Sequence, residues 1–415
     1  MTDSLNSSSV AGTQAGGQPD TGASGNGTSA AQTSGLRRMA SGDLGLIPVI
    51  LALFVIWIVF ESINTHFLSG RNISNLILQI VEIGMLGIGE TFILLLGEID
   101  LSIAAVSGVA AAILVLLSSA GVNPILAILI SILGGALIGL FQGLWVTVVG
   151  VPAFIVTLAG SLAYQGVLLA MLGQTGTVPI MNHTLLAIAT TYISGWGSWL
   201  VAAIGLVIYL WAAFLNRSAR QKFGLHAPSM GAVGLRGLGL AVVSALVVYA
   251  LNSYHGLPFA GVVLLIFVLV FAFITQSTRF GRHVYALGGN GEAARRAGIN
   301  IKGIRIAVFT MAGAFGAIGG IVGASRLGSA SPASGTGNLL LDSIAAAVIG
   351  GTSLFGGRGS VWNAFAGALV IGSVENGMDL LSAPSSTKYL VEGGILLIAV
   401  TIDTLTRRRR NKLGR

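Results

Sequence analysis

Long runs of apolar residues recur along this chain, and short polar stretches separate them. A helix needs about 20 such residues to cross the hydrocarbon core of a bilayer. The candidate spans by this criterion are 46–63, 73–97, 101–119, 124–149, 151–172, 198–215, 238–253, 257–276, 304–323, 339–356, 360–378 and 388–406. The pattern predicts an all-α, polytopic membrane bundle of about 10–12 transmembrane helices. The segments 101–119 and 238–276 are the weakest, and either could be re-entrant or broken.

Composition excludes a soluble globule. Hydrophobic residues make up 54% of the 415 residues and charged residues only 9%, whereas soluble domains carry about 25% charged residues. The chain contains no Cys, which excludes disulfides, thiolate metal sites and a cysteine nucleophile.

The two ends of the chain differ from the apolar middle. Residues 1–45 are rich in Ser, Thr, Gly, Ala and Gln, so they cannot bury enough surface to offset the entropy of ordering. We therefore expect a disordered cytoplasmic tail at 1–45, a transmembrane permease domain at 46–406 and a basic cytoplasmic C-terminus at 407–415. Arg37 and Arg38 fit a cytoplasmic flank of the first span better than a twin-arginine export signal.

Charge placement sets the orientation. The chain has 22 Lys and Arg residues and a net charge of +8. With the N-terminus inside, only Arg71, Arg326 and Lys388 fall on the outer side. This bias follows the positive-inside rule of membrane proteins and gives no support for a nucleic-acid partner. The prediction is a multi-pass protein of the cell (inner) membrane with both termini in the cytoplasm.

The chain lacks the usual signatures of catalysis. None of its four Lys residues follows a Gly, so it has no G-x-x-x-x-G-K-[ST] phosphate loop. The Gly-rich stretch 350–360 has no Lys and favours a tight turn between helices over a phosphate cradle. No two His residues have metal-ligand spacing, and no nucleophile and base form a set. We therefore expect no enzyme and no bound cofactor or metal, with any ATP hydrolysis on a separate polypeptide.

Ionisable residues within or near spans are candidates for function by default. They are Glu82, Glu90, Glu98, Asp100, Asp342, Glu375, Asp379 and Glu392. Successive members of the trio Glu82, Glu90 and Glu98 are about 80° apart around a helix, so they form no single stripe. Many of the group lie near span ends. This favours helix-end or cavity-lining roles, with a proton or sodium relay as the alternative.

Small residues recur at helical spacing within two spans. Gly135, Gly139 and Gly143 share one helix face, and Gly316 and Gly319 are each followed by a Gly four residues later. Such faces allow close helix contact in lipid. They predict a packed bundle and say nothing of the substrate.

The most informative polar stretch is the basic segment 279–303 between two spans. Asn290 is a good N-cap, Glu292 falls in the first turn, and Arg295 and Arg296 fall in the last turn before Gly298. A helix of about two turns is implied, too polar to enter lipid and too short to be stable alone. It is either a capped cytoplasmic loop or a docking helix for a soluble partner.

Four stretches carry a family resemblance, which covers about 46–406. They are 280–299, 349–361, Gly97 to Ser102 and Asn376 to Met378. Together they closely resemble the permeases of monosaccharide ABC importers, of the branched-chain amino acid and ribose type. Stretches 151–160 and 325–328 and an inserted hairpin at about 217–276 make the chain most like D-xylose permeases. One departure is Ile103-Ala104-Ala105, where the family usually has Val-Gly-Ser.

The resemblance implies a membrane-spanning permease subunit that translocates a monosaccharide. It also implies a homodimer with a pore on the twofold axis, an extracytoplasmic sugar-binding protein, and an ABC ATPase that carries ATP and Mg. The implied ATPase-coupling residues are Asn290, Glu292, Ala293, Ala294, Arg295 and Gly298. The implied family-motif or gating residues are Glu98, Asp100, Ser102, Gly350, Gly351, Thr352, Ser353, Gly356 and Gly357. The alternatives are an ion-coupled secondary sugar transporter, or a related permease for ribose, galactose or another small polar solute.

Overall fold

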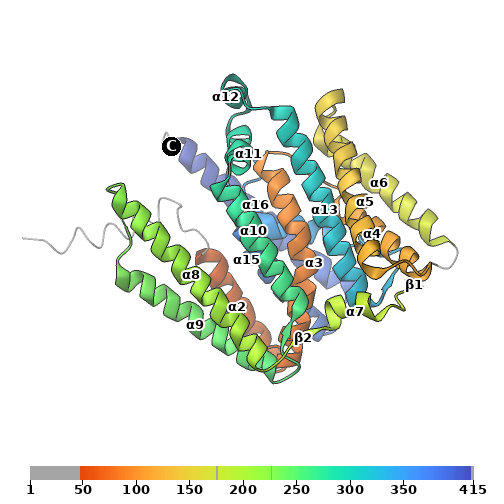
Figure 1. Ribbon diagram of the computed structural model, residues 1–415, viewed down its shortest axis with the longest axis horizontal. Coiled ribbons are helices and arrows are strands. Elements are labelled where there is room, and N and C mark those ends of the chain that lie inside the picture. Colours follow the sequence, from red (N-terminus) through yellow and green to blue (C-terminus); the bar gives the residue numbers. More distant parts are fainter. Residues whose placement is uncertain (1–46, 174–175, 226, 413–415) are drawn as a thin grey trace, which may run out of the picture. The chain divides into compact units, whose positions relative to one another are not determined.

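A computed structural model describes residues 47–173, 176–225 and 227–412. The chain divides into two compact units, and the unit from Gly45 to Arg415 contains all the described residues. The predicted disordered tail at 1–45 lies outside them, as do the last residues of the predicted basic C-terminus. The described residues form a helical bundle, which confirms the predicted fold class (Figure 1).

The helices vary widely in length. In chain order they are α2 (Ile47–Ile63), α3 (Gly70–Leu95), α4 (Ile103–Ser119), α5 (Pro124–Leu144), α6 (Ala153–Leu172), α7 (His183–Thr190), α8 (Trp196–Lys222), α9 (Met230–Asn252), α10 (Phe259–Ser277), α11 (Arg279–Gly289), α12 (Gly291–Arg296), α13 (Ile301–Leu327), α14 (Leu339–Ile349), α15 (Val361–Leu380) and α16 (Ser385–Lys412). A π-helical turn at Trp145–Val149 extends α5, and left-handed Gly150 makes a tight turn into α6.

Two short antiparallel strand pairs tie connections together. Strand β1 (Val178–Pro179) pairs with β4 (Ser329–Ala330), and β2 (Tyr192–Ile193) pairs with β3 (Leu257–Pro258). Each pair joins segments that lie far apart in the sequence.

The helix lengths agree with a membrane bundle. Within the described ranges, 7 helices are long and apolar enough to cross a membrane, and α2, α4 and α14 are shorter apolar helices. The 7 are α3, α5 with its π-helical turn, α6, α8, α9, α10 and α13. The orientation of the termini stays a prediction.

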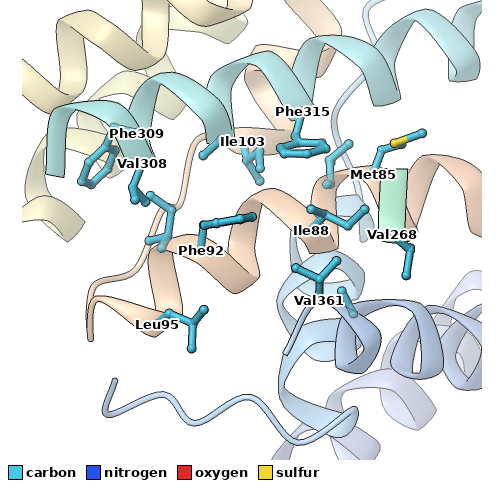
Figure 2. Packing of buried hydrophobic residues seen from close by; sticks show 14 of the residues in the cluster. Met85, Ile88, Phe92, Leu95, Ile103, Val268, Val308, Phe309, Phe315 and Val361 are labelled. Atoms are coloured by element: carbon cyan, nitrogen blue, oxygen red, sulfur yellow. The ribbon is translucent and has the colours of Figure 1, made fainter. Parts of the chain in front are cut away.

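The core is built around α3 and α13. On α3, Met85, Ile88 and Phe92 are fully buried, and they pack with Phe309 and Phe315 of α13 (Figure 2). Most residues of α3 are buried, as expected of a helix that is enclosed by other helices.

The predicted small-residue face of α5 meets α13. A Cβ added at Gly139 would overlap the carbonyl oxygen of Phe309, and one at Gly135 would overlap the carbonyl oxygen of Gly313. At Gly143, a Cβ would lie 2.9 Å from the Cα of Ile306. The prediction of close helix packing is therefore confirmed, with backbone against backbone.

Two of the helices start beside the middle of a longer neighbour. The carbonyl of Ile103, the first residue of α4, lies against Gly316 of α13, and Ser107 one turn later lies against Gly320. Helix α14 packs in the same way along α3, from Ser343 beside Gly87 to Val348 beside Leu94. Thus α3 and α13 are each followed by a turn that re-enters the bundle and by a half-helix that packs on the other long helix.

Two sequence predictions need correction here. The predicted span 339–356 is wrong, because α14 ends at Ile349 and its 11 residues are about 17 Å long, far short of about 30 Å of hydrocarbon. The segments 238–253 and 257–276 do not form a hairpin with each other. Helix α9 pairs with α8, whereas α10 packs against α3 and α15.

The α8–α9 hairpin lies at the periphery of the bundle (Figure 1). Ser198 is the buried residue of α8, and α9 buries Gly237, Val248 and Leu251. The remaining side chains of these two apolar helices are exposed or half-buried.

Candidate functional site

We call the end of the bundle that carries α11, α12, the last turn of α3 and the first turn of α13 the basic end (Figure 1). The predicted short helix is present there as α12. Asn290 caps it, because its side chain accepts a hydrogen bond from Ala293 N at 2.9 Å. Glu292 pairs with Arg295 at 2.9 Å and with Arg296 at 3.3 Å. These charges are exposed, so each pair contributes little to stability and the surface is open to a partner.

The six predicted coupling residues divide into two groups. Asn290, Glu292, Ala293, Arg295 and Gly298 are exposed, whereas Ala294 is buried. Gly298 has φ +78° and closes the helix, as the sequence predicted. Ala294 therefore holds α12 against the bundle and does not offer its side chain to a partner.

Helix α11 was missed by the sequence analysis, although the same segment was singled out. Thr278 caps it by accepting from Gly281 N at 3.2 Å, and its apolar face buries Val284 and Leu287. The signal was available, because apolar residues at 280, 284 and 287 have helical spacing.

Helix α11 is fastened to two other segments of the basic end. Gly288 packs so closely on the end of α3 that a Cβ would overlap the carbonyl oxygen of Leu95. Gly357 N donates to that same oxygen at 2.9 Å, and the Tyr285 hydroxyl donates to Gly359 O at 2.7 Å. These contacts join α11 directly to α3 and to the 350–360 loop.

The Gly-rich loop 350–360 is more than a turn. Gly356 lies against Gly97 and the carbonyl of Gly288, both through backbone atoms, and Gly350 packs on the Asn363 carbonyl. Gly351 has φ +108°, which favours glycine. Thr352 is buried, and Ser353 Oγ donates to Asp403 at 3.5 Å. The structure therefore brings three of the predicted stretches, around 97, 288 and 356, into one contact.

Glu98 forms an ion pair with Arg305, a residue far away in the sequence. Its carboxylate lies 2.7 Å from Arg305 Nε in the first turns of α13. Burial raises the pKa of Glu98, and the Arg305 guanidinium opposes that rise. The pair joins the turn after α3 to the helix that follows the coupling segment.

Asp100 and Ser102 form a buried network at the start of α4. Ser102 Oγ donates to Asp100 at 2.6 Å, and Gln142 of α5 donates to Ser102 Oγ at 2.6 Å. Thr157 of α6 accepts from Leu101 N at 3.0 Å. These contacts fix the re-entrant turn in place, and Asp100 and Ser102 line neither of the two cavities described below.

A polar cavity of about 260 Å³ lies at the opposite end of the bundle, between the two half-helices. Its polar and charged lining comes from α3, α4, α13, α14, α15, α16 and the 328–338 turn, and includes Gln79, Glu82, Ser107, Arg326, Asn338, Asp342, Glu375 and Lys388. Arg326 lies 3.8 Å from Glu82, and Lys388 pairs with Asp379. The cavity-lining role that the sequence favoured for ionisable residues thus fits Glu82, Asp342 and Glu375.

A second cavity of about 390 Å³ lies next to the first. It is lined by Asn72, Asn75, Leu78, Gln79, Arg326, Asn376, Asp379 and Leu380. Gln79 and Arg326 line both cavities. The sequence analysis did not single out Gln79, because one Gln in an apolar run carries no pattern.

Apolar packing lies between the first cavity and the basic end. Leu94 of α3 packs there with Ile344, Ala347 and Val348 of α14. Leu101, Leu340 and Leu354 pack against this group. We call these seven residues the apolar plug. The first cavity and the basic end thus lie on opposite sides of the plug.

The sequence comparisons agree with this architecture. The profile for the permease component of branched-chain amino acid transport systems matches residues 72–400. The chain belongs to this permease family. A xylose transport system permease protein of Haemophilus influenzae is 38% identical over 376 residues, covering 90% of this chain and 99% of that protein. The Escherichia coli K12 xylose permease is 37% identical over 380 residues, covering 91% of this chain and 96% of that protein.

Permeases for other sugars also match. A ribose import permease of Bacillus subtilis is 30% identical over 372 residues, which cover 90% of this chain and 97% of that protein. No solved structure matches the chain.

Proposed function

We propose that this chain is the membrane subunit of an ATP-driven importer of a monosaccharide, with D-xylose as the first candidate. The observation that carries the proposal is the junction at the basic end. An exposed, charged helix, α12, follows α11 after the single residue Asn290, and α11 packs closely on Leu95 and the 350–360 loop. Such a junction can convert movement of a soluble partner into movement of α3 and α13. The relatives named for xylose transport support the choice of sugar.

The partners follow from this role. The basic end faces the cytoplasm and docks an ABC ATPase, which binds ATP and Mg. The cavity end faces outward and receives sugar from an extracytoplasmic binding protein. A second copy of the chain completes the pore, and the apolar helices contact lipid.

A charge reversal in α12 tests the docking role. In Glu292→Lys the new ammonium lies beside Arg295 and Arg296 and at a helix N-terminus, where a cation is unfavourable. We expect uptake to be lost and the ATPase no longer to co-purify, while membrane insertion is unchanged. Ala294→Asp, which buries a carboxylate, should have the same effect.

Arg220→Glu is the matched control, because Arg220 is exposed at the end of α8 and lies outside the coupling segment. It should keep both uptake and ATPase association. Normal ATPase association of Glu292→Lys in a pull-down would contradict the docking role.

An ion-coupled secondary transporter is the second candidate, because Glu90 is fully buried and both its carboxylate oxygens are without a hydrogen-bond partner. Uptake by this chain in vesicles without any ATPase decides between the two. The importer requires ATP and the ATPase. Uptake that persists without them and collapses with an uncoupler would favour the secondary transporter.

A further inference from the structure

Two residues, Gln79 and Arg326, line both cavities, and each carries a buried polar atom without a hydrogen-bond partner. Gln79 Nε2 donates to Asp379 at 3.5 Å, but Gln79 Oε1 is buried and has no partner. On the facing helix, Arg326 lies 3.8 Å from Glu82 through Nη2, while its Nε is also buried without a partner. One acceptor and one donor are therefore free on the two residues that both cavities share.

Buried polar atoms without partners are rare in folded proteins because each is costly. Both atoms are closed off in this conformation, so a ligand that supplies a donor and an acceptor reaches them once the Gln79 and Arg326 side chains rotate toward the cavities that these residues line. A sugar hydroxyl does both, and neighbouring hydroxyls on a pyranose can reach two side chains at once.

The remaining lining suits the same ligand. Asp342, on the first turn of α14, is 3% exposed and lines the first cavity. Asn72, Asn75 and Asn376 line the second cavity, and Asn72 Nδ2 donates to Asn376 at 2.7 Å. Amides, carboxylates and one guanidinium are groups that bind neutral polyols. The first cavity has a volume of about 260 Å³, whereas sites for drug-sized ligands have about 300–1,000 Å³. Its size therefore suits a smaller ligand, such as a monosaccharide.

We propose that Gln79 and Arg326 form the centre of a transient binding site for the transported neutral monosaccharide. This inference rests on the proposed function. It adds the position within this chain at which the sugar binds during transport. The apolar plug lies between the cavity and the basic end. The sugar therefore stays bound at Gln79 and Arg326 until Leu94 and Ile344 move apart.

The first test measures transport and ATP hydrolysis separately, in proteoliposomes that hold the full complex with its ATPase and binding protein. Gln79→Leu removes the free acceptor, and Arg326→Lys keeps the charge beside Glu82 but removes the Nε donor. We expect D-xylose uptake to fall about 5- to 10-fold in each, as one lost hydrogen bond predicts. ATP hydrolysis stimulated by sugar-loaded binding protein should stay within about twofold, because the α11 junction is intact.

Gln221→Leu is the control of identical chemistry, since Gln221 is exposed near the end of α8 and far along the chain from either cavity lining. It should transport as the unaltered protein does. A complex of unaltered chains that does not transport D-xylose would contradict the proposed function. Normal uptake by both cavity variants would instead contradict the site alone.

The second test detects the sugar in the cavity directly. Because the chain contains no Cys, Thr336→Cys places a single thiol in it, on the cavity lining. We expect millimolar D-xylose to slow labelling of this thiol by a membrane-impermeant maleimide at least threefold, and Gln79→Leu to remove that protection. Labelling that is equally fast with and without the sugar would overturn the proposal.

Discussion

The two re-entrant turns of this protein each follow one of the two long central helices, but they differ in how deeply their residues are buried. The turn at 96–102, after α3, is closed by the Glu98–Arg305 pair and by the buried Asp100, Ser102 and Gln142 network. The turn at 328–338, after α13, is half-exposed and lines a cavity. The comparison shows a turn that is packed into the bundle at the basic end and a turn that lies beside a cavity at the other end.

The largest effect is expected at the backbone contact that seals the basic end. Gly288→Ala should lower uptake at least about tenfold, because the added methyl overlaps the Leu95 carbonyl and overpacking costs about 1–3 kcal/mol. Gly289→Ala is the matched control, since nothing lies within 4 Å of its Cβ position. Uptake in proteoliposomes measures both. An equal loss of uptake in the two variants would contradict a role for the close contact between Gly288 and Leu95, because Gly289→Ala leaves that contact unchanged.

A smaller effect is expected from identical substitutions in the two turns. Ser102→Ala leaves Asp100 and Gln142 buried without their shared partner, which costs about 1–3 kcal/mol. In the outer turn, Ser334→Ala removes only the acceptor for Ser331 N at 3.0 Å in a half-buried segment, so about 1 kcal/mol or less is expected. The midpoint of thermal unfolding should fall further for Ser102→Ala. The reverse order would contradict the assignment of the ordered turn.

The smallest effect is expected at the ion pair. Arg305 is partly exposed, so Glu98→Gln should weaken the seal by about 1 kcal/mol. We expect ATP hydrolysis without binding protein to rise a few-fold. The double reversal, Glu98→Arg with Arg305→Glu, should bring hydrolysis back toward its original rate. A double variant no better than either single change would show that the pair does not hold the turn.

Much of the helical framework could be predicted from sequence, because lipid leaves the backbone no alternative to internal hydrogen bonding. The glycine spacing in α5 even predicted a close helix contact, although it could not name α13 as the partner. The capping residues of α12 were predictable for a similar reason, since they act within a few residues of each other.

The half-helix α14 and the cavity could not be predicted in this way. Gly350 and Gly351 do mark a helix end after Ile349, but the hydropathy of the run carried the predicted span past them to 356. The sequence could not show that Gly350 packs against Asn363 on α15. Arg305 and Arg326 both pair with carboxylates on or just after α3, more than 200 positions earlier in the chain. Hydropathy is a property of neighbours in sequence, whereas these contacts depend on neighbours in space.

The exposed α8–α9 hairpin has a consequence for spectroscopy. Helix α8 carries Trp196, Trp199 and Trp211, three of the 6 tryptophans of the chain, and they are 90%, 41% and 65% exposed. Half of the tryptophans therefore report on one peripheral helix, and the other three, Trp57, Trp145 and Trp362, are not buried either. With Trp57, Trp145 and Trp362 replaced by Phe, quenchers placed at known depths in the acyl chains would map the tilt of α8.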